Sequence, residues 1–474
     1  MSGILLLNAL FLVAGAGLLW GLRGWGSWSE VVRLGGVAYM LGVAAAGVGA
    51  TLVLVAGGGL STAAILGLTL GIALAGVSAG IVRKRPLPRA PRLSIRARLP
   101  LTLEGYLTVF LAAVVFVLLV DLFRSAYHEP LISWDAWAFW VPKAKAIYFF
   151  GGLDEQLFRS LPGPSYPLLV PALDAMDFRL MGTPDTSMLA VQYWFLFAGF
   201  SLAAAGMLQR IARPALTWLF IATAAVLPEL DHRLLQQLGD WPLDIFFALG
   251  ALALVCWLQT DASWFLGVYT IMTAAMFATK REGQLLGACL VGGALAATVW
   301  RRRRASLSIL GLTLVAYAVN IPWRLWWTSR GLTPDTPDGG LGQMTANSDR
   351  ILPGLRLVAQ LLFNPHLWLV ATPVVIAAAL IGLASKERGV PIFYLVTGIL
   401  AIVGFAWIIW SIPSLPISTK PSLTPIPRAV GAIALLSVAL APVLLSLLLR
   451  PAKDAAAGPE PVRQVVEQTT AASP

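Results

Sequence analysis

LEGYLTVFLAAVVFVLLVDLF, the stretch from Leu103 to Phe123, decides the fold of this chain. No residue between Glu104 and Asp121 carries a charge. An α-helix needs about 20 mainly apolar residues to cross the hydrocarbon core of a bilayer, which is about 30 Å thick. A helix also satisfies all of its backbone hydrogen-bonding groups within one segment, where water is absent. The stretch therefore predicts a membrane-spanning helix.

Runs of the same kind lie on both sides of this stretch and fill most of the chain. The 474 residues are 58% hydrophobic and only 12% charged. A soluble domain has about 25% charged residues, so lipid must solvate much of this surface. The pattern predicts an all-α polytopic membrane protein with about 13 transmembrane helices. The other expected spans are 4–22, 34–57, 61–82, 186–208, 214–229, 242–260, 263–279, 283–300, 306–327, 366–384, 391–411 and 428–449.

The net charge of +11 does not indicate a nucleic-acid partner. The basic residues stand in short clusters between apolar runs, which is typical of the cytoplasmic loops of membrane proteins. Residues 83–98 include seven basic residues and no acid, so we expect this loop inside and the N-terminus outside. Alternation along the chain also places inside Arg210, Arg213, Arg301 to Arg304, Lys386, Arg388 and the tail after Arg450.

Several other classes of protein or site are disfavoured by the sequence. The run from about Ile4 to Leu22 has no basic residue before it, so we expect a retained span and not a cleaved signal peptide. Cys256 and Cys289 both lie inside apolar runs, which argues against a disulfide framework. The three histidines are far apart in the sequence, which argues against a histidine metal cage.

The acidic residues gather in the segments that alternation places outside. They concentrate between Asp121 and Asp185, between Glu229 and Asp244, and between Asp335 and Asp349. Acids have little influence on membrane insertion, so this gathering hints at a site and not at topology.

The outer segment from Tyr127 to Asp185 is too long for a tight connection and too apolar for a disordered one. Pro142 can begin a short helix that Gly151 and Gly152 end. A second short helix is expected from about Pro167 to Leu180. Both are too short to span a bilayer, so we expect amphipathic helices that lie in the outer interface. On the second helix, Asp174 and Asp177 lie away from the shared apolar face.

The element Trp134-Asp135-Ala136-Trp137 is the most informative part of this outer segment. A carboxylate between aromatic side chains just above a span lies at a low-dielectric boundary, and such a group is suited to general-base work. The alternative interpretation is a belt of interfacial aromatic residues with a solvated Asp135 among them.

Six short elements follow one another across roughly residues 103–330. They are Ser133-Trp134-Asp135-Ala136-Trp137, KAKAIYFFGG from Lys143 to Gly152, Tyr166-Pro167-Leu168, Gly239-Asp240-Trp241-Pro242-Leu243, Lys280-Arg281-Glu282-Gly283 and Pro322-Trp323-Arg324. In order and spacing they resemble the GT-C polytopic glycosyltransferases that use polyprenyl-phosphate sugars. The resemblance is greatest to the branch with protein O-mannosyltransferases and lipid A aminoarabinose transferases.

The resemblance implies a division of the chain. Residues 1–100 would form an N-terminal three-span extension with its basic cytoplasmic loop. Residues 101–330 would form a GT-C-like catalytic core that includes the outer loop 127–185. Residues 331–449 would add an outer loop and the C-terminal spans, although they resemble no family element, and 450–474 would be a disordered cytoplasmic tail. The chain departs from the family at Ala136, where many members carry a second acid, so a divalent metal is not supported.

The resemblance also implies an activity, which is inverting transfer of a sugar from a polyprenyl-phosphate donor at the outer face. Asp135 would be the catalytic base. The leaving phosphate needs cationic partners. The expected ones are Lys280, Arg281, Lys143, Lys145 and Arg324. For each cation a structural role stays open. Lys280 and Arg281 could pair with Glu282 or extend to the membrane interface, and Lys143 and Lys145 could lie on the solvated face of an interfacial helix. Arg324 could be held by the neighbouring tryptophans.

Four further residues are expected to bind substrate: Asp240, Asp244, Tyr166 and Glu282. Asp240 and Asp244 lie one turn apart at the start of a span. They could bind sugar hydroxyls, or they could stabilise the helix through a favourable interaction with its dipole. No metal ligand and no firm cofactor is predicted. The expected partners are the lipid-linked donor, a glycan, lipid or protein acceptor, and the bilayer itself. The expected location is a cell membrane, with the active site on its extracytoplasmic side.

Two other functions stay open. A secondary transporter or lipid flippase would also have many spans, but it should show inverted repeats and charges near the midplane. No internal repeat is evident in the sequence, and the charges gather at the outer ends of the spans. A non-catalytic scaffold in envelope assembly is the third hypothesis.

Overall fold

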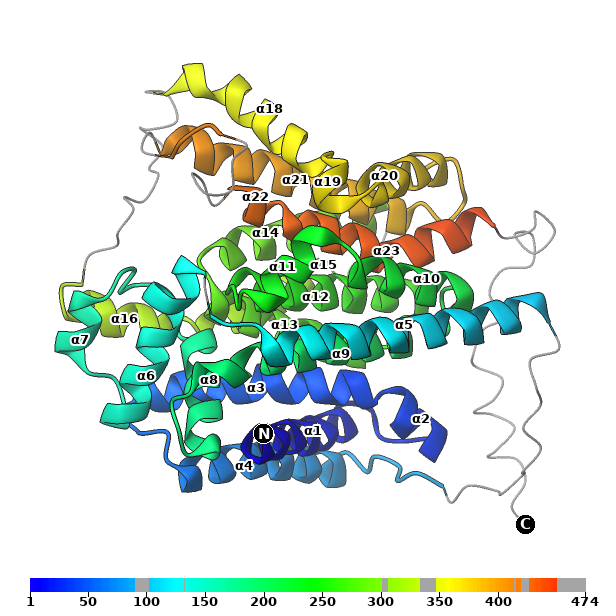
Figure 1. The fold of residues 1–474 in the computed structure, drawn as a ribbon. Helices are drawn as coiled ribbons and strands as arrows, with labels where there is room; N and C mark the ends of the chain where they lie inside the picture. The colour runs from blue at the N-terminus through cyan, green and yellow to red at the C-terminus, as the bar shows by residue number, and fades with distance from the viewer. Residues whose placement is uncertain are drawn as a thin grey trace, which may run out of the picture.

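A computed structural model shows a bundle of helices that run side by side (Figure 1). It describes residues 1–89, 102–131, 133–300, 306–332, 347–412, 415–418 and 426–449. Within these ranges the structure has helices and turns and no strand, apart from one isolated bridge between Ser27 and Arg89. The expected basic cluster at Arg301 to Arg304 and the expected disordered tail lie outside the described residues.

The first half of the chain forms four long helices, a group of short elements and another long helix. The elements are α1 (Ser2–Arg23), α2 (Trp28–Arg33), α3 (Gly35–Val55), α4 (Thr62–Val82), α5 (Leu103–His128), the π-helix η1 (Asp135–Trp140), α6 (Val141–Phe150), α7 (Glu155–Ser160), α8 (Leu169–Met181), the 3₁₀ turn η2 (Thr186–Met188) and α9 (Leu189–Leu208).

The second half of the chain contains the remaining helices. They are α10 (Pro214–Ala225), α11 (Pro228–Leu235), α12 (Asp240–Thr260), α13 (Trp264–Thr279), α14 (Glu282–Trp300), α15 (Ser306–Ala318), α16 (Ile321–Ser329), the 3₁₀ turn η3 (Ser348–Arg350), α18 (Ile351–Leu362), α19 (Pro365–Trp368), α20 (Ala371–Gly382), α21 (Gly389–Ser411), α22 (Ile426–Ala429) and α23 (Gly431–Leu448).

Every apolar run named from the sequence is at least partly helical, but not every run is long enough to cross a membrane. Ten helical segments in the described residues have the length and hydropathy of a span. The other three, α10, α13 and α20, have 12, 16 and 12 residues. At 1.5 Å per residue they are about 18 to 24 Å long, less than a hydrocarbon core. The chain is therefore a multi-pass helical membrane protein with fewer full-length spans than expected.

The N-terminal extension is a tightly packed group of three helices. Glycines let α1 approach its neighbours at backbone distance. A Cβ atom added at Gly15 would lie 1.6 Å from the carbonyl oxygen of Ala38 on α3, and one at Gly42 would lie 1.7 Å from that of Phe11. On the other side of α1, a Cβ at Gly17 would lie 2.5 Å from the carbonyl oxygen of Ala73 on α4. Small residues promote this kind of packing between membrane helices.

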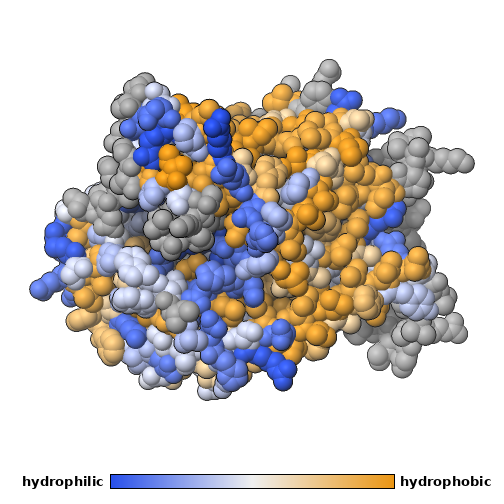
Figure 2. Space-filling model, turned by 45° about the horizontal axis from the view of Figure 1, so that its top comes forward, coloured by the Kyte–Doolittle hydropathy of each residue, from blue (hydrophilic) through white to orange (hydrophobic). Residues whose placement is uncertain are grey.

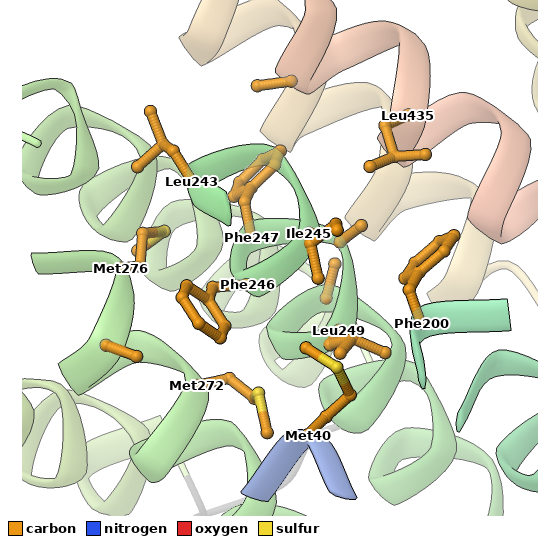
Figure 3. Packing of buried hydrophobic residues seen from close by; sticks show 14 of the residues in the cluster. Met40, Phe200, Leu243, Ile245, Phe246, Phe247, Leu249, Met272, Met276 and Leu435 are labelled. Carbon is orange, nitrogen blue, oxygen red and sulfur yellow. The ribbon is translucent and has the colours of Figure 1, made fainter. Parts of the chain in front are cut away.

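Helix α12 lies at the centre of the bundle (Figure 1), and every residue from Asp240 to Leu258 is buried. Figure 3 shows its Phe246 and Leu249 among methionines of α3 and α13, with Phe200 of α9 and Leu435 of α23 beside the same helix. In contrast, α5 exposes large apolar side chains along most of its length. Such a surface is stable only against lipid, which agrees with a membrane span.

The two short helices of the outer segment form where the sequence places them. Helix α6 ends at Gly151 and α8 ends at Gly182, and both glycines have the left-handed conformation, with φ of 77° and 74°. The expectation that α8 is an amphipathic helix lying in the outer interface is wrong. Its Asp174 and Asp177 are buried, because α8 packs against α6, α1 and α3.

Polar and apolar surfaces separate along the bundle. In Figure 1, α6, α7 and α16 gather at one end, while α2, the end of α4 and the start of α5 lie at the other. Figure 2 shows a broad hydrophobic surface across the middle of the molecule and hydrophilic residues gathered at the end with α6 and α7. We call this the outer end, because the outer segment of the sequence forms it.

Candidate functional site

Four segments that are far apart in the sequence bring charged side chains together at the outer end. Asp135 begins η1, and Asp240 begins α12. Lys280 follows α13 in an extended conformation, with φ of −147° and ψ of 161°, so that the chain turns sharply before α14. Arg428 lies on α22, which leads into the last helix. These helix ends present their side chains to one another because the helices start and stop at the same level.

The side chains at these positions form a chain of ion pairs, which we call the outer charge cluster. The Lys280 ammonium lies 2.8 Å from Oδ1 of Asp240 and 3.4 Å from Oε1 of Glu282. Arg428 contacts Oδ2 of Asp135, and its Nη1 lies 3.9 Å from Oδ2 of Asp240. Asp240 therefore bridges the two cations, and each cation reaches one further carboxylate.

Exposure divides the carboxylates of the outer charge cluster into two kinds. The side chains of Asp135 and Glu282 keep 28% and 25% of their surface exposed, whereas Asp240 keeps 6%. Burial alone would lower the pKa of Lys280, but the carboxylates of Asp240 and Glu282 outweigh it and raise that pKa above its ordinary value. Asp135 and Glu282 are therefore partly open to the surroundings, while Asp240 holds a charged lysine in place.

A small pocket with two guanidinium groups adjoins this cluster. Arg281 contacts the hydroxyl of Ser165, and its guanidinium lies 5.2 Å above the ring of Tyr166. Arg324 contacts the hydroxyl of Tyr317. The pocket has a volume of about 140 Å³. Its lining residues are Ser165, Pro167, Arg281, Gln284, Asn320, Trp323, Arg324 and Trp327. Guanidinium, amide and hydroxyl donors around a small space suit an anion.

Tyr166 lies between the pocket and the cluster. The Glu282 carboxylate and burial raise the pKa of its phenol to about 12, so the hydroxyl stays protonated at neutral pH. Lys143 supports the turn that carries it. The Lys143 ammonium donates to the Gly163 carbonyl at 2.6 Å and lies 3.6 Å from the centre of the Phe139 ring. Lys143 is buried, so the interpretation of this residue as part of a solvated helix face is wrong.

Two of the expected site residues lie apart from the rest. Lys145 lines a different pocket of about 500 Å³, together with exposed aromatic residues such as Trp137 and Phe149. Asp244 belongs to a buried network inside the bundle. It contacts Arg233, whose Nε lies 3.3 Å from Oε1 of Glu229. Asp240 and Asp244 are one helical turn apart, yet they pair with different cations.

Three residues of these networks, Arg428, Arg233 and Ser165, are not among the site residues that the sequence predicts. Arg428 lies in the region that resembles no family element, so the resemblance could not point to it. One signal was available, since Arg428 is a basic residue at the outer end of the last span, on the side where acids gather. Among the described residues, there is no group of three or more His, Cys, Asp or Glu side chains that could hold a metal ion.

Comparison with known proteins adds no name to this geometry. The chain matches no family model, no curated protein and no solved structure. The fold and the outer charge cluster therefore define a class only, which is a multi-pass helical membrane protein with a polar site at one end of its bundle.

Proposed function

We propose that this protein is an inverting glycosyltransferase that moves a sugar from a polyprenyl-phosphate donor to an acceptor at the outer face of the membrane. The main support is the convergence of an accessible carboxylate, a chain of partly buried ion pairs and a two-arginine pocket at one end of the bundle. A lipid-linked donor needs this arrangement, because its phosphate lies at the headgroup level while its chain stays in the bilayer.

In the proposed reaction, Asp135 takes the proton from an acceptor hydroxyl. That oxygen then bonds to the anomeric carbon of the donor sugar from the side opposite the phosphate. The bond from the anomeric carbon to the phosphate oxygen breaks, and polyprenyl phosphate leaves with the electron pair. Arg428 contacts only Oδ2 of Asp135, which leaves Oδ1 to accept the acceptor proton. One base is enough, because the phosphate is a stable leaving group.

The phosphate would bind between Arg281 and Arg324, near the ammonium of Lys280. Donors aimed at the developing negative charge are usually the largest contribution to this kind of catalysis. Asp240 would act as a positioning residue that holds Lys280 and Arg428. Glu282 and Tyr166 would contact sugar hydroxyls. Asp244 has 1% of its side chain exposed, so in this proposal it holds Arg233 and contacts no substrate.

The decisive experiment compares wild type with Asp135→Asn, purified and supplied with polyprenyl-phosphate sugars. We expect transfer by the wild type and a loss of about 10²-fold or more in kcat for the variant, because general-base catalysis contributes about 10²- to 10⁴-fold. Asp349→Asn removes an exposed outer acid in η3, away from the outer charge cluster and both pockets, and should leave the rate unchanged. Undiminished turnover by Asp135→Asn would refute the base assignment. No transfer by the wild type with any donor would refute the enzyme.

A proton-coupled transporter is the second candidate, and one observation favours it. Asp177 is fully buried on α8, and neither of its carboxylate oxygens has a hydrogen-bond partner within the described chain. Buried acids in membrane proteins often carry protons. The test is to reconstitute the protein in liposomes and impose a solute gradient. Acidification by the wild type that is lost in Asp177→Asn would favour transport over sugar transfer.

A further inference from the structure

A large open pocket at the outer end lies beside the outer charge cluster but contains none of its residues. It has a volume of about 720 Å³, within the range of about 300 to 1,000 Å³ that is common for small-molecule sites. Its lining comes from three loops or helix ends. They are Leu54 to Gly59 at the end of α3, Phe150 to Asp154 at the end of α6, and Trp326 and Arg330 at the end of α16.

Two glycine-rich loops form most of the pocket wall and touch each other. The Leu60 N–H donates to the Gly151 carbonyl at 3.0 Å. A Cβ atom at Gly59 would lie 2.5 Å from the same carbonyl oxygen, so only glycine allows this approach. One loop belongs to the N-terminal extension and the other to the outer segment. The first three helices therefore contribute directly to the surface of the outer end.

The chemistry of the lining is polar and balanced in charge. Five glycines, at 57–59 and 151–152, leave most of the wall as bare main chain. The Gly57 and Gly58 N–H groups donate to Leu54 and Val53, and the Gly151 carbonyl accepts from Leu60, so a ligand meets the remaining main-chain groups. Asp154 caps α7 through Oδ1, which accepts from the Leu157 N–H at 2.7 Å, and Arg330 pairs with Glu155 at 3.4 Å. A ligand that offers both donors and acceptors and has no net charge fits such a lining. A polyhydroxylated chain, that is, a carbohydrate, has this character.

The pocket and the two-arginine pocket lie on either side of one aromatic pair. Trp323 lines the smaller pocket and stacks on Trp326, which lines the larger one, with ring centres 5.2 Å apart. Helix α6 separates Phe150, at the larger pocket, from η1 and Asp135. Its 10 residues cover about 15 Å. A single sugar in the larger pocket could not reach Asp135, but an oligosaccharide bound there could extend to it.

We infer that this open pocket binds a distal part of a neutral glycan chain and is the acceptor subsite of the proposed transferase. The role as an acceptor subsite rests on the proposed function, but glycan binding at the pocket can be tested without any sugar transfer. It gives the N-terminal extension a role, since the Gly57 to Gly59 loop completes the subsite. It also selects a glycan acceptor over a protein or lipid one.

The test is direct binding of neutral linear oligosaccharides of glucose, mannose, galactose or arabinose, from disaccharide to hexasaccharide. Full-length protein in nanodiscs is titrated and followed by saturation-transfer NMR. We expect at least one series to bind more tightly as its chain lengthens. The double variant Arg330→Gln with Asp154→Asn should weaken binding about tenfold or more, and Asn at position 154 still caps α7.

Arg210→Gln is the matched control. Arg210 pairs with Glu30, at 3.2 Å, and neither residue lines the pocket, so its loss should leave binding unchanged. Thermal midpoints of the variants close to the wild-type value show that the fold is intact. Absence of binding by the whole panel, or equal binding by wild type and the double variant, overturns the inference. Glycan binding that persists in Asp135→Asn, with no transfer by wild type, keeps the subsite and rejects the transferase.

Discussion

At the scale of single residues, the outer charge cluster depends on how each charge is compensated. Asp240 is the central member, because it touches both Lys280 and Arg428 while it is almost completely buried. Removal of one partner from a buried ion pair leaves an uncompensated charge, which is costly. The exposed members, Asp135 and Glu282, can be changed with less effect on folding, and this makes them suitable for kinetic tests.

Arg428→Gln should lower kcat by about 10²-fold, because Asp135 and Asp240 then lose the cation that orients them. Arg428→Lys keeps the charge and should restore part of the rate. Arg210→Gln breaks a comparable ion pair, with Glu30 at 3.2 Å, outside the outer charge cluster and serves as the control. Steady-state transfer rates measure the effect. Equal rates for Arg428→Gln and the control would exclude a role for Arg428.

Stability should depend on pH through the buried acids of α8. Burial raises the pKa of Asp174 to about 8, whereas an unfolded chain ionises it near pH 4. Between these values the folded protein binds more protons than the unfolded one, so the stability from Asp174 is complete below about pH 4 and is lost as the pH rises to about 8. Asp174→Asn should therefore raise the thermal midpoint at pH 8 and not at pH 4. An equal effect at both pH values would contradict this.

At the scale of elements, backbone approach decides which helices pack. Helix α1 is held between α3 and α4 through glycines, whereas several glycines of α4 face open space. The glycines at 151 and 182 have a different role, because their positive φ ends α6 and α8. Glycine therefore has two roles in this fold, which are close packing of helices and termination of helices. Only the second role is easily predicted from the sequence.

Gly42→Ala should destabilise the protein, because its Cβ would meet the carbonyl oxygen of Phe11 at 1.7 Å. Overpacking of this kind costs about 1 to 3 kcal/mol. Gly71→Ala on α4 adds a methyl group where no atom lies within 4 Å and is the matched control. Thermal unfolding in detergent measures both variants. A thermal midpoint for Gly42→Ala equal to that of the control would show that α1 and α3 can move apart without loss of stability.

At the scale of the whole molecule, the separation of polar and apolar surface sets the orientation in the membrane. The outer segment, the outer charge cluster and both pockets beside α16 lie at one end of the bundle. The positive-inside rule assigns the opposite end, with its basic loops, to the cytoplasm. A donor with a lipid anchor would then reach the cluster from the outer leaflet.

Single cysteines test this orientation. Ser160→Cys on α7 should react with an impermeant maleimide added to intact cells, because the positive-inside rule predicts that this end faces outside. Lys386→Cys, between α20 and α21, should react only after the membrane is opened. Both positions are exposed, and the native Cys256 and Cys289 are buried and should stay unlabelled. Labelling of Lys386→Cys in intact cells would reverse the assigned orientation.

The sequence by itself determined the helical membrane class, the positions of the apolar helices and the ends of α6 and α8. These depend on local properties, namely the length of an apolar run and the φ that glycine allows. Only the tertiary structure decided which charges meet. Asp135 pairs with Arg428, 293 residues away, and Asp177 is buried on a helix that packs against several others. Contacts of that kind depend on the packing of the whole bundle, and no local pattern records them.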